Sequence, residues 1–306
     1  MPVKRLLCLL SSLLLLALLC LPAAAAPVPP EISAPSAILM ESSTGKILYE
    51  KEANTPLPPA SVTKIMTILL VAEAIDSGRI SLDDMVTASE TAASMGGSQI
   101  YLEVGESMSV QDLLKAIVVA SGNDAATAMA EHIAGSTEGF VALMNQKAEE
   151  LGMDNTTFVN CHGLDADGHL TTAHDIALMS AELLEKHPWI TDYTTIWMDS
   201  LRGGAFELAN TNKLLRSYTG TTGLKTGSTD LAKYCLSASA VRGDMQLIAV
   251  VMAAPSTAER FKSAAQLLDF PLETALTQNG IKRSSYLLPL PITLMAKSSK
   301  SHTTCL

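Results

Sequence analysis

The sequence contains few charged and few aromatic residues, which account for 17% and 4% of its 306 positions. Hydrophobic residues make up 48% of the chain. Such a composition excludes a disordered protein, because a disordered chain lacks the apolar residues needed to form a core. The length is sufficient for one large core or two modest ones.

Cysteine is also scarce. Of the five cysteines, Cys8 and Cys20 lie in the apolar N-terminal run, which leaves Cys161, Cys235 and Cys305. Three is an odd number and no two of them form a C-x-x-C pair, so the spacing predicts neither a disulfide framework nor a thiolate zinc site. Buried free thiols at Cys161 and Cys235 are the favoured interpretation, since an unpaired cysteine behaves as a small apolar residue. A bridge between these two cysteines is the alternative.

The longest hydrophobic run lies at the N-terminus. Lys4 and Arg5 precede the Leu-rich residues 6–21, and Pro22 and four alanines follow. A basic start, an apolar stretch of about 15 residues and an Ala-x-Ala end are typical of a secretory signal peptide rather than of a membrane-spanning helix. The sequence thus predicts a signal peptide over 1–26 and an exported protein on the cell-wall or periplasmic side of the membrane.

Basic residues are outnumbered by acidic ones. Leaving out Lys4 and Arg5 reduces the 21 basic residues to 19, against 31 acidic residues, so the net charge becomes −12. Nucleic-acid binding needs a basic surface that faces the phosphates. We therefore expect no nucleic-acid partner.

Strand patterns occur at both ends of the remaining chain, and helical patterns lie between them. Two β-hairpins are predicted, over 37–50 and 232–254, with a Gly/Thr-rich strand over 219–227 before the second. Early and late strands in one sheet, with helices on its faces, predict an α/β sandwich-type domain with an inserted helical block. Helices are predicted over 61–75, 110–120, 125–134, 139–151, 173–185 and 256–268, the last capped by Ser256 with Glu259 three residues on.

The first candidate for chemistry is the S-x-x-K segment formed by Ser61 and Lys64, at the start of the predicted helix 61–75. One helical turn separates the two residues, so the hydroxyl and the amine lie on the same face. A lysine shielded from water loses its proton more readily and can then serve as the base that a serine nucleophile needs. Backbone N–H groups at the helix start also face developing negative charge. Alone, the pattern is also typical of an exposed lysine beside a helix cap.

Two further triplets carry polar groups. Ser121, Gly122 and Asn123 lie at a break between two predicted helices, where the hydroxyl and the amide can face a common cleft; a plain helix end is the alternative. Lys225-Thr226-Gly227 lies on the strand ahead of the second hairpin. A strand points Lys225 and Gly227 to one side and Thr226 to the other, and glycine allows close approach of a ligand backbone.

The three triplets follow the order S-x-x-K, S-x-N and K-T-G, on a helix start, an interhelical break and a late strand. This set resembles the motifs of penicillin-binding proteins and serine β-lactamases. Because Gly122 occupies the middle of the second motif, the sequence is similar to the D-alanyl-D-alanine carboxypeptidase branch of low-molecular-mass penicillin-binding proteins. The resemblance extends from about residue 34 to 268 and includes Pro59-Ala60-Ser61-Val62-Thr63-Lys64, Gly97-Ser98-Gln99-Ile100, His162-Gly163-Leu164-Asp165 and Asn210-Thr211-Asn212-Lys213-Leu214.

The resemblance implies an α/β fold of the β-lactamase/DD-peptidase type, in which helices flank an antiparallel sheet. It also implies a serine peptidase that removes the terminal D-alanine from peptidoglycan pentapeptide stems, without a metal or cofactor. β-Lactam antibiotics are then expected to be covalent inhibitors. In this interpretation Ser61 attacks the carbonyl between the last two D-alanines, Lys64 is its general base, and Ser121 relays the proton to the leaving D-alanine.

The remaining site residues are expected, again by resemblance, to bind substrate. Two backbone N–H groups, those of Ser61 and Ser228, would form an oxyanion hole, and such donors contribute about 10²–10³ in rate to a serine hydrolase. Asn123 is expected to bind the substrate peptide. Lys225 is expected to support the relay and to attract the terminal carboxylate. Thr226, with Gly227 beside it, and Arg260 are expected to bind that carboxylate.

Two other chemistries fit the sequence poorly. His162, His169 and His174, together with Cys161, lack the spacing of a common zinc site and are interpreted as a polar loop held by hydrogen bonds. The paired acids 83–84 and 149–150 are interpreted as solvent-facing rather than as a glycosidase pair.

A serine β-lactamase is the nearest alternative, since it shares the acylation machinery. One large class deacylates through a Glu in an E-x-x-L-N segment. Here Glu207, Leu208 and Asn210 form a segment one residue too short and too far along the chain, which we interpret as structural. The second alternative is a wall-binding protein without activity, against which the three intact motifs argue.

The sequence predicts a signal peptide over 1–26, a peptidase domain over 27–270 and a tail over 271–306. Carboxypeptidases of this branch usually continue into a small β-rich domain and a membrane-surface helix, neither of which is recognisable after Leu268. The apolar stretch 286–295 is interrupted by Pro289 and Pro291 and is too short to cross a bilayer. Peripheral membrane association and a truncated chain both stay open at this point.

Overall fold

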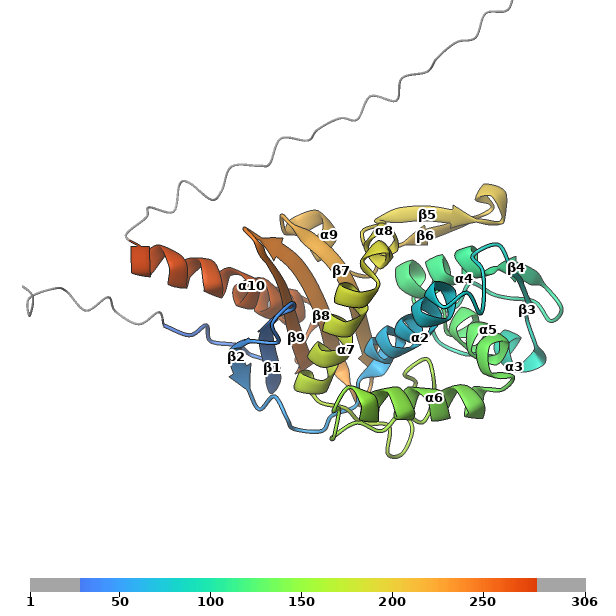
Figure 1. Cartoon of the computed structure of the whole chain (residues 1–306), viewed down its shortest axis with the longest axis horizontal. Coiled ribbons are helices and arrows are strands. Elements are labelled where there is room, and N and C mark those ends of the chain that lie inside the picture. The colour runs from blue at the N-terminus through green and yellow to red at the C-terminus, as the bar shows by residue number, and fades with distance from the viewer. Residues whose placement is uncertain (1–27, 280–306) are drawn as a thin grey trace, which may run out of the picture. The chain divides into compact units, whose positions relative to one another are not determined.

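The computed structural model describes residues 28–279, and a five-stranded antiparallel sheet joins early and late strands of this range (Figure 1). The strand order is β2-β1-β9-β8-β7, so the first hairpin pairs with the last strand. The predicted sheet of early and late strands is thereby confirmed. Its strands are β1 (Ser36–Glu41), β2 (Ile47–Lys51), β7 (Thr221–Thr229), β8 (Lys233–Arg242) and β9 (Met245–Ala254).

Alternating side chains of the sheet enter two separate cores. In β1, Ala37 and Leu39 pack in the same apolar cluster as Leu267 of helix α10 (Thr257–Asn279), whereas Ile38 and Met40 belong to the cluster that includes helix α7 (Ala173–Lys186). This two-residue alternation is the geometry of a strand covered on both faces. Figure 1 accordingly shows α10 on one side of the sheet and α7 on the other. The α/β architecture expected from the sequence is confirmed.

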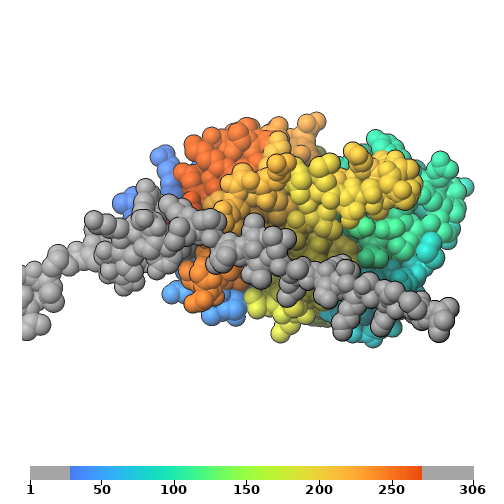
Figure 2. Space-filling view, turned by 90° about the horizontal axis from the view of Figure 1, so that it is seen from above, coloured from blue at the N-terminus to red at the C-terminus, as the bar shows by residue number. Residues whose placement is uncertain are grey.

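The helical block lies between β2 and β7, and helix α2 (Lys64–Asp76) is its centre. Every α2 residue from Lys64 to Ala72 is buried, so the helix is surrounded by protein on all sides. In Figure 2 the green and cyan residues of this block lie at one end of the face shown, next to its yellow residues near 200, and the orange residues of the chain's last part lie beyond the yellow ones. The other elements of the block are η1 (Ala60–Thr63), β3 (Met85–Thr87), α3 (Glu90–Ala93), β4 (Ser107–Ser109), α4 (Val110–Lys115), η2 (Ala116–Ala120), α5 (Asn123–Ala134), α6 (Thr137–Glu150), η3 (Pro188–Ile190), α8 (Thr191–Thr194), β5 (Met198–Leu201), η4 (Arg202–Gly204), β6 (Phe206–Ala209) and α9 (Leu214–Ser217).

The predicted helix over 61–75 differs from the structure at its start. Ser61 lies in the 3₁₀ turn η1, and the α-helix begins only at Lys64. Tighter 3₁₀ geometry is frequent at helix N-termini, where the first N–H groups have no intrahelical partner. The spacing of one turn between the hydroxyl and the amine is preserved.

The last helix, α10, extends beyond its predicted end and beyond the domain boundary expected at residue 270. Its start follows the expectation, because the Glu259 backbone N–H donates to Ser256 Oγ at 3.2 Å. The predicted signal peptide over 1–26 and residues 280–306 of the tail lie outside the described residues. Within residues 28–279, no helix is both long and apolar enough to cross a membrane.

The late strand β7 contacts the turn η1 through backbone at Gly227. A Cβ atom at Gly227 would lie 2.8 Å from the Ser61 backbone nitrogen and 2.9 Å from the Pro59 carbonyl oxygen. Distances this short are not tolerated between non-bonded atoms, so the strand can approach η1 only where a side chain is lacking. The glycine expected to admit a ligand backbone thus admits the protein's own turn.

This contact predicts that Gly227→Ala separates η1 from β7. The added methyl meets backbone atoms that cannot rotate away, so we expect a loss of about 1–3 kcal/mol in the free energy of unfolding, as for other overpacked sites. Thermal denaturation measures the effect. Gly96→Ala is the matched control, because a Cβ there meets no atom within 4 Å. Equal melting temperatures for the two variants would contradict the prediction.

Candidate active site

Ser61 and Lys64 form the centre of the site. Ser61 is half-buried on η1, and Lys64 is the first residue of α2, with 0% of its surface exposed. The Lys64 amine lies 3.1 Å from Ser61 Oγ, within hydrogen-bond distance. The one-turn spacing read from the sequence therefore places hydroxyl and amine in contact.

Two further atoms surround the Lys64 amine. It donates to Asn123 Oδ1 at 2.6 Å and to the His162 carbonyl oxygen at 2.7 Å. Both oxygens can only accept a hydrogen bond. A neutral amine has two N–H groups and one lone pair, so once both N–H groups are donated the lone pair faces Ser61. In this protonation state the Ser61 hydroxyl donates to Lys64, as a nucleophile must before it loses its proton to a base.

The surroundings favour the neutral amine. Burial lowers the pKa of Lys64 well below its ordinary value, and the positive charge of Lys225 lowers it further. Asp124 and Cys161 oppose this shift to a smaller extent. Because burial penalises the charged form, Lys64 is suited to accept a proton near neutral pH.

Ser121 lies at the end of η2, a π-helical turn, and adopts left-handed backbone angles with φ 65° and ψ 29°. Left-handed angles in a residue other than glycine are strained, and such strain and π-helical turns are both concentrated at functional sites. The Ser121 side chain is 3% exposed, and its Oγ has no hydrogen-bond partner within the described part of the chain. Its role as a proton relay stays a prediction.

Asn123 is 2% exposed, and both ends of its amide are engaged. Nδ2 donates to the Gly96 carbonyl at 2.7 Å, which fixes the orientation of the amide, because a carbonyl accepts only. Oδ1 therefore faces Lys64. The structure thus shows a hydrogen bond between Asn123 and Lys64 that the sequence did not indicate. The expected hydrogen bond from Asn123 to the substrate peptide stays a prediction.

The buried Asp124 supports the site through backbone contacts that sequence reasoning missed. Its carboxylate accepts the backbone N–H groups of Ile100 and Leu102 at 3.0 and 3.1 Å. It thereby fixes the segment 97–102 beside Asn123, whose own N–H donates to the Ser98 carbonyl at 2.7 Å. An aspartate directly after the S-x-N triplet was the available signal.

Lys225 lies on β7 with 1% of its surface exposed, and its amine donates to the Thr226 carbonyl at 3.3 Å. Burial lowers the pKa of Lys225 to about 7, and the Arg260 charge contributes to this shift. At neutral pH a proton on Lys225 is therefore easily gained or lost. The backbone contact between Gly227 and Ser61 places the K-T-G strand beside the S-x-x-K turn, and the Lys225 charge accordingly lowers the pKa of Lys64.

The other residues of β7 differ in exposure. Thr226 is 5% exposed and donates from Oγ1 to Thr211 Oγ1 at 2.6 Å. Ser228 is exposed near the strand end, one residue past the Gly227 contact with Ser61. The next residue, Thr229, donates to Asp165 Oδ1 at 2.7 Å and so connects the strand to the loop that carries His162. The expected oxyanion hole, formed by the N–H groups of Ser61 and Ser228, stays a prediction.

Arg260 is buried, with 6% exposure, and donates from Nη1 to the carbonyls of Gly227 and Cys235 at 3.1 and 3.2 Å. Its guanidinium also lies over the Phe261 ring, 4.7 Å from the centroid. The structure thus gives Arg260 an anchoring contact with the K-T-G strand that the sequence did not indicate. Recognition of a carboxylate by this residue stays a prediction.

The loop expected to be held by hydrogen bonds has that character. The two ring nitrogens of His169 lie 2.8 Å from Thr63 Oγ1 and 2.9 Å from the Val159 backbone nitrogen. Burial lowers the pKa of His162 and of His169 to about 4, so both rings are neutral at pH 7. Among residues 28–279, no group of three His, Cys, Asp or Glu side chains is arranged to hold a metal ion.

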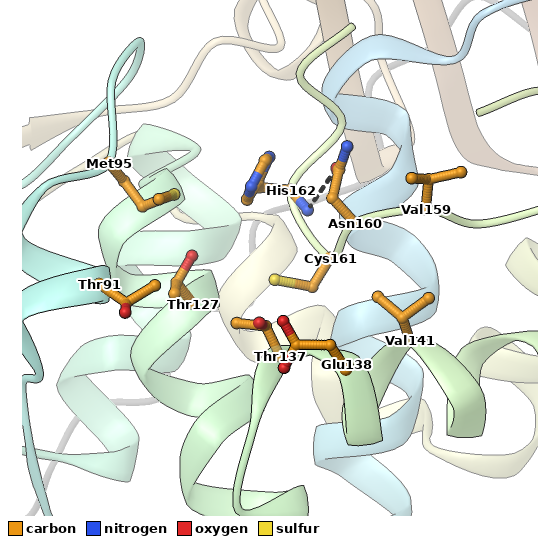
Figure 3. A pocket seen from close by; sticks show the side chains of 10 residues that line it. All are labelled: Thr91, Met95, Thr127, Thr137, Glu138, Val141, Val159, Asn160, Cys161 and His162. Atoms are coloured by element: carbon orange, nitrogen blue, oxygen red, sulfur yellow. Dashed lines mark hydrogen bonds between the residues drawn. The ribbon is translucent and has the colours of Figure 1, made fainter. Parts of the chain in front are cut away.

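The Cys161 side chain lines a cavity of about 270 Å³ between the loop 159–162 and helices α5 and α6 (Figure 3). The Cys161 carbonyl accepts from Thr67 at 2.6 Å on α2, and the next carbonyl, that of His162, accepts from Lys64. Burial raises the pKa of the Cys161 thiol to about 11. Cys161 and Cys235 are both buried and free, as expected.

The residues of the E-x-x-L-N-like segment have structural surroundings rather than those expected of a deacylating Glu. Glu207 is exposed on β6, and Leu208 is buried against the core. The Asn210 side chain donates to the Ile196 carbonyl at 2.8 Å. These contacts agree with the structural interpretation of the segment.

Comparison with known proteins yields consistent matches. A family model described as D-alanyl-D-alanine carboxypeptidase matches residues 23–256. The chain is 52% identical over 254 residues to D-alanyl-D-alanine carboxypeptidase DacF of Bacillus subtilis. That match covers 82% of this chain but 65% of the relative, so the chain spans slightly less than two thirds of its relative's length.

Solved structures share the fold. Penicillin-binding protein 6B of Escherichia coli is 41% identical, with a TM-score of 0.75 and coverage of 80% of this chain and 78% of that one. Penicillin-binding protein D2 of Listeria monocytogenes, in its ampicillin-bound form, is 35% identical, with a TM-score of 0.72 and coverage of 79% and 100%.

The coupling between the two buried lysines predicts a pH effect. The reactivity of Ser61 should fall at acid pH, where Lys64 becomes protonated. Lys225→Gln removes the positive charge that lowers the Lys64 pKa, so this acidic limb should move to higher pH. The measurement is the pH profile of Ser61 acylation by a small activated ester, followed by mass spectrometry of the protein.

The control is Lys147→Gln, because Lys147 is paired with Glu73 and Glu150 and contributes nothing to the Lys64 shift. Its profile should match that of the unmodified protein. An acidic limb that stays in place in Lys225→Gln would show that the two amines do not interact.

Proposed function

The chain belongs to the D-alanyl-D-alanine carboxypeptidase family, and from this premise we propose that it hydrolyses the terminal D-Ala-D-Ala bond of peptidoglycan pentapeptide stems. The reaction passes through an acyl-enzyme on Ser61. The observation that carries the proposal is the position of the Lys64 amine, which lies 3.1 Å from Ser61 Oγ and donates to two obligate acceptors, so that in its neutral form the lone pair faces Ser61.

In the acylation step, Lys64 takes the proton of the Ser61 hydroxyl while Oγ bonds to the carbonyl carbon of the penultimate D-alanine. The negative charge that develops on the carbonyl oxygen is stabilised by the backbone N–H groups of Ser61 and Ser228. The C–N bond then breaks, and the proton held by Lys64 passes through Ser121 to the nitrogen of the leaving D-alanine, which leaves Lys64 neutral again. The unpartnered, buried Ser121 hydroxyl supports this assignment.

In the second step, water attacks the ester carbonyl and transfers a proton to Lys64. The bond between Ser61 Oγ and the acyl carbon breaks, Oγ takes the proton back from Lys64, and the shortened peptide leaves with a new carboxylate whose acid proton goes to solvent. Lys225, Thr226 and Arg260 supply the positive and polar groups for the terminal carboxylate of the substrate. The substrate class places the protein's action at the cell wall, outside the cytoplasm.

β-Lactams are proposed as covalent inhibitors, because a strained cyclic amide can acylate the same serine. The ampicillin-bound relative from Listeria monocytogenes supports this. Glu207 is exposed on β6 and offers no counterpart to the deacylating Glu of one large β-lactamase class, so the acyl-enzyme should persist.

The activity test is release of D-alanine from a peptide that ends in D-Ala-D-Ala. Ser61→Ala removes the nucleophile, so release should fall by at least about 10³-fold, in keeping with serine hydrolases. A protein that releases no D-alanine before mutation contradicts the carboxypeptidase proposal. Equal release by Ser61→Ala would exclude Ser61 as nucleophile.

The two alternatives are separated by benzylpenicillin. We expect an adduct on Ser61, detected by mass spectrometry, that outlasts many cycles of peptide turnover. Rapid hydrolysis of the drug without a lasting adduct would identify a β-lactamase. An unmodified Ser61 would identify a protein without a working nucleophile.

A further inference from the structure

A strained tyrosine is exposed close to the site. Tyr101 has a φ angle of 58°, in the left-handed region that residues with large side chains rarely adopt. Even so, 68% of its surface is exposed. Packing of the side chain therefore does not offset the strain of the backbone. Strain that persists under these conditions is concentrated at functional positions, so the Tyr101 ring calls for a ligand.

Side chains from separate elements hold the backbone around Tyr101. The buried Asp124 carboxylate accepts the N–H groups of both its neighbours in the chain. Arg202 of η4 donates to the Ile100 carbonyl at 2.8 Å and to the Tyr101 carbonyl at 3.2 Å. The guanidinium is itself fixed, because it donates to both oxygens of the Glu106 carboxylate at 2.8 and 3.0 Å. These contacts place the Tyr101 ring at a defined position on the surface.

The segment that carries Tyr101 begins at the reaction centre. The Ser98 carbonyl accepts the Asn123 backbone N–H at 2.7 Å, and Asn123 Oδ1 accepts from the Lys64 amine. Tyr101 follows Ser98 by three residues, so their Cα atoms are at most about 11 Å apart. Four residues of a pentapeptide stem precede the scissile bond, and they span up to about 14 Å when extended. The stem is thus long enough to bring its point of attachment to the ring.

The surface beside Tyr101 is hollowed over a volume of about 400 Å³. The residues that line it are two aromatic rings, two carboxylates, an arginine and an alanine, namely Tyr101, Phe206, Glu103, Glu106, Arg202 and Ala205. The Tyr101 and Phe206 rings meet edge to face, with their centroids 6.2 Å apart. The hydrogen bond from Arg202 lowers the pKa of Glu106, so this carboxylate is ionised at neutral pH and can only accept.

A sugar ring matches the chemistry of this lining. The C–H face of a pyranose packs on an aromatic ring, and its hydroxyl and N-acetyl groups supply the hydrogens that carboxylates accept. An apolar wall with a few placed polar groups, at this volume, is typical of a small-molecule site. The carboxylates of a stem peptide, in contrast, would be repelled by Glu103 and Glu106.

We propose that this hollow binds a sugar ring of the peptidoglycan glycan strand, with Tyr101 as the stacking platform and Glu103 and Glu106 as acceptors for its hydroxyl groups. This proposal rests on the proposed function, because the glycan is the polymer to which the stem peptide is attached. Arg202 is a positioning residue, which holds the Tyr101 backbone and the Glu106 carboxylate. The hollow makes the protein selective for stems attached to glycan over free stems.

The test compares a free pentapeptide with the same pentapeptide attached to its N-acetylated disaccharide. The measured quantity is the ratio of kcat/KM for D-alanine release from the disaccharide-bearing substrate to that from the free one. Tyr101→Ala removes the stacking ring, so this ratio should fall about three- to tenfold, as expected for one lost aromatic contact. An unchanged ratio in this variant would overturn the inference.

Two variants serve as controls. Tyr101→Phe keeps the ring and should keep the ratio. Val104→Ala should also keep it, because Val104 is 62% exposed in the same loop but lies outside the lining of the hollow. A loss of folded protein lowers both rates equally and cancels in the ratio. A fall in Val104→Ala as large as that in Tyr101→Ala would assign the effect to the loop as a whole and contradict the proposal.

The competing occupant is a basic side chain of the stem, whose ammonium the two acids would attract. Glu103→Gln distinguishes the two ligands, since glutamine still accepts hydrogen bonds from hydroxyls but offers no charge to an ammonium. For a pentapeptide with lysine at its third position, kcat/KM could fall with the free peptide as much as with the disaccharide-bearing one. Such equal falls in Glu103→Gln and Tyr101→Ala would identify a peptide side chain as the occupant and overturn the inference.

A binding measurement separates this inference from the proposed function. The probe is a tetrasaccharide of N-acetylglucosamine, which carries no peptide, and its contact with the protein is followed by saturation-transfer NMR. We expect transfer to the sugar protons in the unmodified protein and its loss in Tyr101→Ala. If neither peptide substrate releases D-alanine, the proposed function fails, and the tetrasaccharide still tests the hollow. Equal transfer in the unmodified protein and in Tyr101→Ala would overturn the inference.

Discussion

The site depends on the hydrogen bonds of one buried amine, that of Lys64. In its neutral form this amine has two N–H groups, fewer than the oxygen atoms around it. Lys64 has three oxygen neighbours, of which Asn123 Oδ1 and the His162 carbonyl have no hydrogen to give. Only Ser61 can supply one. Loss of a proton from Lys64 therefore does not leave a random lone pair; it creates a base that points at the nucleophile, and burial favours that loss.

This arrangement needs parts of the chain that are far apart in sequence. The turn η1 lies between β7 on one side and the loop 160–163 on the other. A Cβ at Gly227 would collide with the Ser61 nitrogen, and a Cβ at Gly163 would overlap the Ala60 carbonyl. Two glycines from different elements thus permit the backbone approach that places hydroxyl, amine and K-T-G strand together. The two glycines allow close packing around the nucleophile. The chemistry requires this packing, but the glycines take no part in the reaction itself.

Much of this could be predicted from the sequence. Helical and strand periodicity indicated the sheet, the inserted block and the helix that carries Lys64, because apolar spacing reports directly on burial. The order of three motifs indicated the residues of the site. Spacing alone could not show that the Asn123 amide faces Lys64, since that depends on the Gly96 carbonyl, which a separate loop provides.

The same limit applies to Arg260 and Thr211. A sequence shows that an arginine begins a helix after the last strand, but not that its Nη1 reaches two carbonyls of neighbouring strands. It shows an Asn-Thr-Asn segment, but not that a hydroxyl on β7 donates to it. Side-chain contacts between elements depend on tertiary packing, which local patterns do not contain. Asp124 illustrates the intermediate case: its position after the S-x-N triplet was visible, and its two backbone partners were not.

Two lysines in one buried region are suited to opposite tasks. Burial lowers both pKa values, and the charge of Lys225 lowers that of Lys64 further. In the proposed reaction, a bound carboxylate near Lys225 favours the protonated form of that amine. A protonated Lys225 in turn lowers the pKa of Lys64, whereas the carboxylate itself raises it, so the two added charges offset each other at the base and burial continues to favour its neutral form.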